Sequence, residues 1–181
     1  MKAVYIDEHG GPENLIYGEM PEPQIGRDEV LVKVKARALN RREMFVRDGS
    51  HGTRGTLPQI IGMEGSGDVV QVGEGVPNVS VGDRVFGGLR GAYAEYAKAH
   101  YLDVHPIPQE MSYEGASTIH VVFSTAWHLL MCRAKVQAGE DVLIMAAGSG
   151  VGIAAIQIAK LAGCQVFTTA GNDEKLEKAK D

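Results

Sequence analysis

A short apolar run that leads straight into a glycine-rich turn constrains the fold of this chain more than any other feature. Val142 to Met145 are four consecutive apolar residues, and the stretch AAGSGVG follows directly. Apolar residues then recur at the spacing of one helix face: Val151, Ala155, Ile158, Ala159 and Ala162. This pattern predicts a helix, which Gly163 can end in the left-handed conformation. Gln165 to Thr169 then predicts a second buried strand.

The order strand, glycine-rich turn, helix, strand is typical of the βαβ unit that opens a dinucleotide-binding fold. Small residues keep Cβ atoms away from a pyrophosphate, and free N–H groups at the helix start face its negative charge. The spacing is G-x-G-x-G rather than G-x-G-x-x-G, and Ala146-x-x-Ser149-x-x-Gly152 is an alternative interpretation of the same turn. Such a turn serves either a cofactor or tight packing alone, and the helix and second strand favour the cofactor. The expected contacts come from Ala147, Gly148, Ser149, Gly150, Val151 and Gly152.

Composition excludes several classes of function. The net charge is −5 and no block of Lys and Arg exists, which argues against a nucleic-acid partner. The apolar runs are too short to cross a bilayer, and the acidic residues at positions 7 and 8 argue against a signal peptide. Cys132 and Cys164 lie in apolar contexts, which predicts two buried thiols, no disulfide and a reducing cytoplasm.

The first hundred residues predict a compact, β-barrel-like domain. Short alternating segments are separated by turns rich in Gly and Pro, and Glu29 to Leu39 alternates so that one face is wet. The predicted strands cover residues 2–6, 15–19, 29–39, 67–72 and 92–97, and residues 81–86 are predicted to form a turn followed by a strand. A short helix is expected over 40–47, and residues 101–108 are expected to be irregular.

The rest of the chain predicts helices around the βαβ unit. Ser112 is expected to cap a helical run from about Tyr113 to Lys135, whose middle is poor in helix formers and favours a break. Asn172 or Asp173 is expected to cap a last helix, in which Glu174 stands four residues before Lys178. We therefore predict a domain over 1–120, then a linker helix and the first βαβ unit over 121–181. A complete doubly wound sheet takes about 130 residues, so this second domain is expected to be incomplete.

Six motifs follow one another along the chain: the opening KAVYIDEHGGPENL, Asn40 to Gly49, Gly62 to Gly67, Val81 to Val85, Gly91 to Tyr96, and Ala146 to Gly152. Taken in this order, they resemble the medium-chain dehydrogenase/reductase superfamily, and most of all its zinc-free quinone oxidoreductase branch. The resemblance implies an α/β chain with a β-rich, GroES-like catalytic domain at the N-terminus, followed by the start of a doubly wound Rossmann domain.

The resemblance also bears on metal binding. The positions that match the catalytic zinc ligands of the superfamily are Asn40, Met63-Glu64 and Val121, where only Glu64 is a ligand type. The four-Cys lobe that binds structural zinc is missing, because Phe86 to Gly91 passes directly between strands. His120 and His128 are eight residues apart, and His51 lies in a predicted loop. We therefore predict no metal site.

The resemblance implies NADPH as the cofactor. Ala170, in the segment that ends at Asn172, stands where NAD enzymes place an acidic residue for the ribose. Lys175 matches a position where the branch uses a cation for the 2′-phosphate, so Asn172 and Lys175 are expected to contact the cofactor. Two alternatives remain open: Lys175 is a solvated lysine, or Asp173 and Glu174 point inward and oppose the phosphate.

The activity implied is hydride transfer from NADPH to a quinone or an activated alkene. Asn40 is expected to meet the developing oxyanion, and Thr125 resembles the threonine that contacts the nicotinamide; alternatively, Thr125 bonds its own backbone. Three arginines close in sequence to Asn40 either add positive charge near the acceptor or are solvated: Arg41, Arg42 and Arg47. Phe45 stands where many relatives have Tyr and cannot donate a proton.

Two other hypotheses remain. One is a relative of zinc alcohol dehydrogenases with a degenerate or borrowed metal site, and the other is a non-catalytic fragment. The resemblance implies a homodimer for a full-length protein. We expect the 181-residue chain alone to be inactive and to bind NADPH weakly or not at all.

Overall fold

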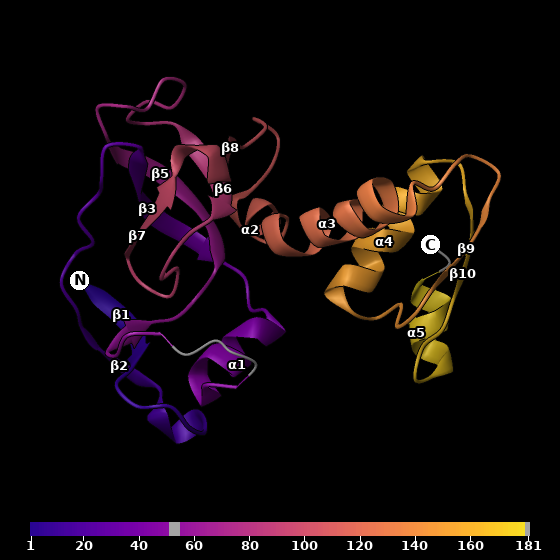
Figure 1. Ribbon diagram of the computed structural model, residues 1–181, viewed down its shortest axis with the longest axis horizontal. Coiled ribbons are helices and arrows are strands. Elements are labelled where there is room, and N and C mark those ends of the chain that lie inside the picture. Colours follow the sequence, from indigo (N-terminus) through magenta and orange to yellow (C-terminus); the bar gives the residue numbers. More distant parts are fainter. Residues whose placement is uncertain (51–54, 180–181) are drawn as a thin grey trace. The chain divides into compact units, whose positions relative to one another are not determined.

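The computed structural model describes residues 1–50 and 55–179. The predicted loop residue His51 lies outside these described residues. The chain divides into two compact units, Met1–Val121 and Val122–Asp181, and the boundary falls within helix α3 (His120–Trp127). Figure 1 shows a β-rich first unit and a second unit in which helices accompany short strands.

The first unit is built from two antiparallel sheets, which confirms the prediction of many short strands. The larger sheet has the order β7-β3-β5-β6-β8, and the smaller has the order β2-β1-β4. The larger sheet contains β3 (Glu29–Arg37), β5 (Glu64–Val72), β6 (Arg84–Gly88), β7 (Tyr96–His100) and β8 (Val104–Pro106). The smaller contains β1 (Lys2–Ile6), β2 (Ile16–Glu19) and β4 (Gln59–Ile60).

Alternation along β3 builds the core of this unit. Val30, Val32 and Val34 are buried, whereas Lys33 and Lys35 are exposed, as the sequence predicts. The valines pack with apolar side chains of the neighbouring strands and loops, among them Val69, Val85, Leu89 and Ala97. Because these contacts come from strands distant in sequence, the core fixes how the strands are paired.

Short helices complete the first unit. Helix α1 (Arg41–Asp48) begins after Asn40 and ends at Gly49, whose φ of 73° is left-handed. Helix α2 (Tyr113–Ser117) begins at the predicted cap, where the Ser112 side chain accepts a hydrogen bond from the N–H of Gly115. Single 3₁₀ turns, η1 (Pro12–Asn14) and η2 (Tyr101–Asp103), lie between strands.

Two predicted elements of this unit are wrong. The sequence predicts a strand over 92–97, but β7 begins at Tyr96, and Ala94 makes only an isolated bridge to Ala3. Residues 101–108 were expected to be irregular, but they contain β8, which pairs with β6. In both cases pairing with a distant strand decides the structure, and local sequence carries no record of that pairing.

The second unit contains the predicted βαβ arrangement. Strand β9 (Asp141–Ile144) leads through the turn to α4 (Gly150–Leu161), and β10 (Gln165–Thr168) lies parallel to β9 with Val166 opposite Val142. Gly163 follows α4 with a φ of 81°, as expected for a left-handed helix end. The predicted run over 113–135 breaks at Thr118–Ile119 and continues as α3 and a π-helix, η3 (His128–Ala134). Helix α5 (Asp173–Lys178) is capped by Asn172.

Burial in the second unit departs from prediction at several side chains. Ile144 is buried against α4 residues such as Ala155 and Ile158, but Leu143 is 63% exposed and Phe167 is 47% exposed. Strands β9 and β10 therefore carry apolar side chains on both faces of their sheet, and α4 covers one of these faces. Cys164 is buried as predicted, whereas Cys132 is exposed on η3, so the prediction of two buried thiols is wrong for Cys132.

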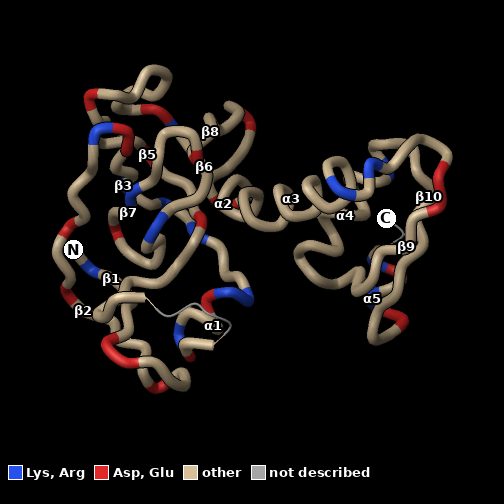
Figure 2. The backbone as a smooth tube through the Cα atoms, in the orientation of Figure 1, with Lys and Arg blue, Asp and Glu red and all other residues tan. Residues whose placement is uncertain are grey.

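Charged residues are mixed in sign in both units. Figure 2 shows Lys and Arg interspersed with Asp and Glu along the backbone. Within the residues that the structure describes, no helix combines the length and apolar character needed to span a membrane.

Candidate functional site

The turn between β9 and α4 is shaped by backbone conformation and by a capping serine. Ala146 adopts a φ of 60°, a left-handed conformation that is uncommon for alanine and has no signal in the local sequence. Its carbonyl oxygen accepts a hydrogen bond of 2.9 Å from the N–H of Ser149. The Ser149 side chain in turn accepts from the N–H of Gly152 at 3.0 Å, and so caps α4. The turn is thus fixed from within.

The three glycines of the turn face different neighbours. A Cβ on Gly152 would lie 2.2 Å from the carbonyl oxygen of Ala146, so this glycine serves the packing of the chain on itself. A Cβ on Gly150 would lie 2.9 Å from Cγ1 of Val122, and one on Gly148 would lie 3.1 Å from Cδ of Lys175. At Gly152 the small residue is therefore required by tight packing, the second of the two roles that the sequence allows for this turn.

The start of α4 leaves donors available for an anion. The Ser149 side chain accepts a hydrogen bond from the N–H of Gly152. The N–H of Ile153 donates to the backbone carbonyl oxygen of Ser149. Among the described residues, the N–H groups of Gly150 and Val151 have no hydrogen-bond partner. Two unpartnered N–H groups at the positive end of a three-turn helix fit a phosphate group.

The structure brings Lys175 to this turn. Asn172 caps α5, and its side-chain oxygen accepts from the N–H of Lys175 at 3.0 Å, which fixes the first turn of the helix. The Lys175 stem then lies against Gly148. A cavity of about 580 Å³ opens here, lined by Ala147, Gly148, Ile153, Ile156, Gln157, Lys175, Lys178 and Ala179. Predicted residues from the turn and from α5 thus share one cavity.

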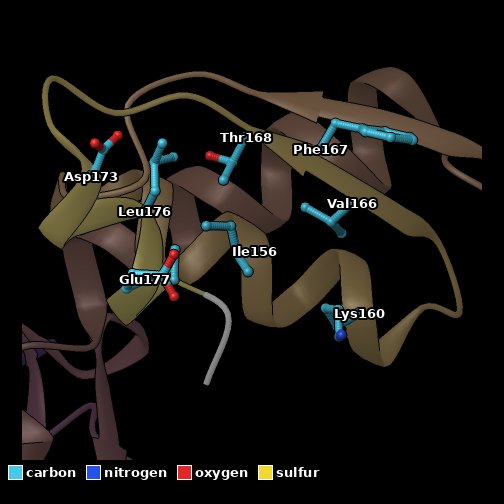
Figure 3. Close-up of a pocket in the computed structure, with 9 residues that line it drawn as sticks. Ile156, Lys160, Val166, Phe167, Thr168, Asp173, Leu176 and Glu177 are labelled. Carbon is cyan, nitrogen blue, oxygen red and sulfur yellow. The ribbon is translucent and has the colours of Figure 1, made fainter.

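The acidic residues that could oppose a phosphate do not line that cavity. Glu174 is paired with Lys178 at 2.9 Å, the predicted pair one helical turn apart. Asp173 instead lines a second cavity of about 520 Å³, formed by α4, β10 and α5 (Figure 3). Ile156, Val166 and Leu176 supply apolar walls there, and none of the predicted cofactor residues lines it.

The predicted catalytic residues belong to different units. Thr125 is exposed on α3 in the second unit, and its contact with a nicotinamide stays a prediction. Asn40 lies in the first unit, half-buried at the start of α1. Its side-chain N–H₂ group donates to Oε1 of Glu64 at 2.7 Å.

Glu64 connects the three positions that the resemblance aligns with zinc ligands. Its side chain is 1% exposed, and its second oxygen, Oε2, accepts from the N–H of Val121 at 2.8 Å. Both carboxylate oxygens are therefore occupied by donors within the first unit. Across the described residues, no group of three or more His, Cys, Asp or Glu side chains forms a metal site.

A second buried carboxyl, Glu43, was not singled out in the sequence. One oxygen accepts from the backbone N–H of Asn40 at 2.7 Å, and the other, Oε1, is buried and has no hydrogen-bond partner among the residues that the structure describes. The spacing Asn40-x-x-Glu43 is that of a capping box, a signal that could have identified this contact. Burial raises the pKa of Glu43, and the nearby charge of Glu64 adds to the shift. Burial likewise raises the pKa of Tyr93, with further contributions from Glu43 and Glu64.

The raised pKa of Glu43 predicts a pH-dependent stability. The folded protein holds this proton more tightly than the unfolded chain, so ionisation of Glu43 costs stability as the pH rises above 4.5, its usual pKa. Glu43→Gln removes this cost. We therefore expect the melting temperature of the variant, relative to that of the wild type, to rise as the pH is raised from 4 to 8. Glu22→Gln, at an exposed carboxyl, is the control, and a difference independent of pH would contradict the assignment.

Comparisons with known proteins match both units. Residues 26–109 match the family described as "Alcohol dehydrogenase GroES-like domain", and residues 150–181 match "Zinc-binding dehydrogenase". A quinone oxidoreductase from Sus scrofa is 38% identical over 177 residues, which cover 96% of this chain and 54% of the relative. The chain thus spans about half the length of the curated relatives it matches.

Solved structures agree in fold. The structure of an NAD-dependent alcohol dehydrogenase is similar with a TM-score of 0.93 and 39% identity, over 99% of this chain and 61% of that chain. The structure of the Escherichia coli quinone oxidoreductase in complex with NADPH is similar with a TM-score of 0.91 and 29% identity. The match covers 99% of this chain and 56% of that chain. These matches confirm the predicted fold class, a GroES-like domain followed by part of a Rossmann domain. The family matches, the curated relatives and the solved structures together support the place of this chain in the medium-chain dehydrogenase/reductase superfamily, in its quinone oxidoreductase branch.

Proposed function

We propose that the full-length protein containing this chain transfers a hydride from NADPH to a quinone or to an alkene conjugated with a carbonyl group, without zinc. The first unit acts as the catalytic domain and the second as the start of the nucleotide-binding domain. The observation that carries the proposal is the turn at α4, where two unpartnered N–H groups lie beside the cavity that Lys175 lines. Bound NADPH supplies the hydride.

The residues of the second unit account for binding. The N–H groups of Gly150 and Val151 receive the pyrophosphate, with Ala147, Gly148 and Ser149 forming the rest of the turn and Gly152 maintaining its shape. Lys175 attracts the 2′-phosphate, and Asn172 sets the position of Lys175. No acidic residue lines this cavity among the described residues, which favours NADPH over NADH. Thr125 contacts the nicotinamide.

The residues of the first unit account for the chemistry at the acceptor. Reduction of a quinone by hydride leaves an oxyanion, and the Asn40 amide donates a hydrogen bond to it. The acceptor gains two electrons with the hydride and one proton from water, because Phe45 has no proton to give. The products are a hydroquinone and NADP⁺.

An assay of the full-length protein tests this function. NADPH oxidation is followed with 1,4-benzoquinone and a series of enones, and a rate above the enzyme-free control is expected. No oxidation above that control with any acceptor would contradict the proposal.

The same protein is expected in the cytoplasm as a homodimer, and sedimentation analysis checks the dimer.

A second candidate function is that of a zinc alcohol dehydrogenase. The match of residues 150–181 to "Zinc-binding dehydrogenase" and the similarity to an NAD-dependent alcohol dehydrogenase favour it. Against it, Met63 and Val121 offer no imidazole or thiolate, and both oxygens of Glu64 accept hydrogen bonds. One tightly bound zinc per chain in metal analysis would favour this alternative over the proposal.

A further inference from the structure

Glu64 lies where three separate parts of the first unit meet. It opens β5, its partner Asn40 precedes α1, and its partner Val121 is the second residue of α3. The two hydrogen bonds measure 2.7 and 2.8 Å, and the side chain is 1% exposed. A buried carboxylate with both oxygens bound to donors has a fixed orientation, because any rotation would leave an oxygen unsatisfied.

The chemistry of a carboxylate also fixes the orientation of the Asn40 amide. An ionised carboxylate only accepts, so Asn40 must present its N–H₂ group, and not its oxygen, to Glu64. One of the two N–H bonds of that group is used in this contact. Among the described residues, the second N–H has no partner. The backbone of Asn40 is anchored independently by Glu43 at 2.7 Å.

We propose that Glu64 is a positioning residue for the reaction: it holds the Asn40 amide so that the second N–H is ready to donate to the oxyanion of the acceptor. The inference rests on the proposed function of Asn40 and adds the group that orients it. A donor already fixed in direction needs no reorganisation when negative charge develops on the acceptor. In this chain a carboxylate thus links the positions that correspond to metal ligands in zinc dehydrogenases.

The substitution Glu64→Gln separates this role from simple packing. Glutamine keeps the size of the side chain but has one acceptor and one donor group. If its oxygen keeps the bond to Val121, its N–H₂ group faces Asn40, and the Asn40 amide must turn over. In the full-length protein we expect kcat to fall about 10- to 100-fold, as for loss of other orienting groups, with KM for NADPH unchanged. Glu29→Gln is the matched control, because Glu29 is a shielded carboxylate of the same unit that pairs with Lys98, and its kcat should stay at the wild-type value.

A spectroscopic readout tests the orientation without using activity. In ¹⁵N-asparagine-labelled full-length protein, assigned through Asn40→Asp, the Asn40 side chain should show one protected and one rapidly exchanging N–H. This measurement requires only the wild type to show the asymmetry, so it remains decisive if Glu64→Gln does not fold. Two equally fast exchanging protons, or a Glu64→Gln kcat within twofold of the wild type, would overturn the proposal. If the wild type itself reduces no acceptor, the proposed function fails, and the exchange asymmetry still decides whether Glu64 orients Asn40.

Discussion

Gly152→Ala is expected to abolish NADPH binding and to destabilise the second unit by about 3 kcal/mol, the upper end of the range for overpacked sites. The added Cβ would lie 2.2 Å from the carbonyl oxygen of Ala146 and 2.9 Å from Oγ of Ser149. A backbone carbonyl cannot move aside as a flexible side chain can, so the turn must open. Opening it displaces Ser149 and redirects the N–H groups of Gly150 and Val151, which we propose as the phosphate donors.

Gly171→Ala is the matched control for this prediction. Its added Cβ would have no neighbour within 4 Å, and Gly171 lies in the same unit, just before the cap of α5. Thermal unfolding and fluorescence titration with NADPH of the full-length protein measure both effects. Normal NADPH affinity in a folded Gly152→Ala protein would show that the shape of this turn is not needed for the nucleotide.

Lys175→Ala is expected to weaken NADPH binding about 10- to 100-fold while leaving NADH binding unchanged. A hydrogen bond to a charged group contributes about 1.5 to 3 kcal/mol, which corresponds to this range of affinity. The Lys175 stem lies against Gly148, so its ammonium group can reach an anion at the turn. NADH lacks the 2′-phosphate and therefore has nothing to lose when Lys175 is removed.

Lys160→Ala controls for a general loss of positive charge. Lys160 lies on α4 and lines the second cavity, in which no predicted cofactor residue takes part. We expect its KM for NADPH and for NADH to match the wild-type values. An equal loss of NADPH affinity in Lys160→Ala and Lys175→Ala, or an equal loss of NADPH and NADH affinity in Lys175→Ala, would show that Lys175 does not recognise the 2′-phosphate. No loss of affinity in Lys175→Ala would favour a solvated lysine at position 175.

The βαβ unit could be predicted from the sequence because its signals are local. Four apolar residues, small turn residues, a 3.6-residue period and a glycine at the helix end each act over a few residues. The structure places β9, α4 and β10 within one or two residues of the predicted bounds. The cap at Asn172 and the ion pair of Glu174 with Lys178 are likewise local.

Features that depend on distant contacts could not be predicted in this way. Residues around Ala94 alternate like a strand, yet they only bridge β1, about ninety positions earlier. The left-handed Ala146 has no signal, because alanine rarely adopts that conformation. Glu64 was considered only as a possible ligand, and its role emerges when Asn40 and Val121 are seen on either side of it.

The most direct test of the account is the structure of the full-length protein with NADPH bound. We expect the pyrophosphate to accept hydrogen bonds from the N–H groups of Gly150 and Val151, and the 2′-phosphate to lie beside Lys175. A nucleotide bound away from Ser149 and Gly150 would contradict the account.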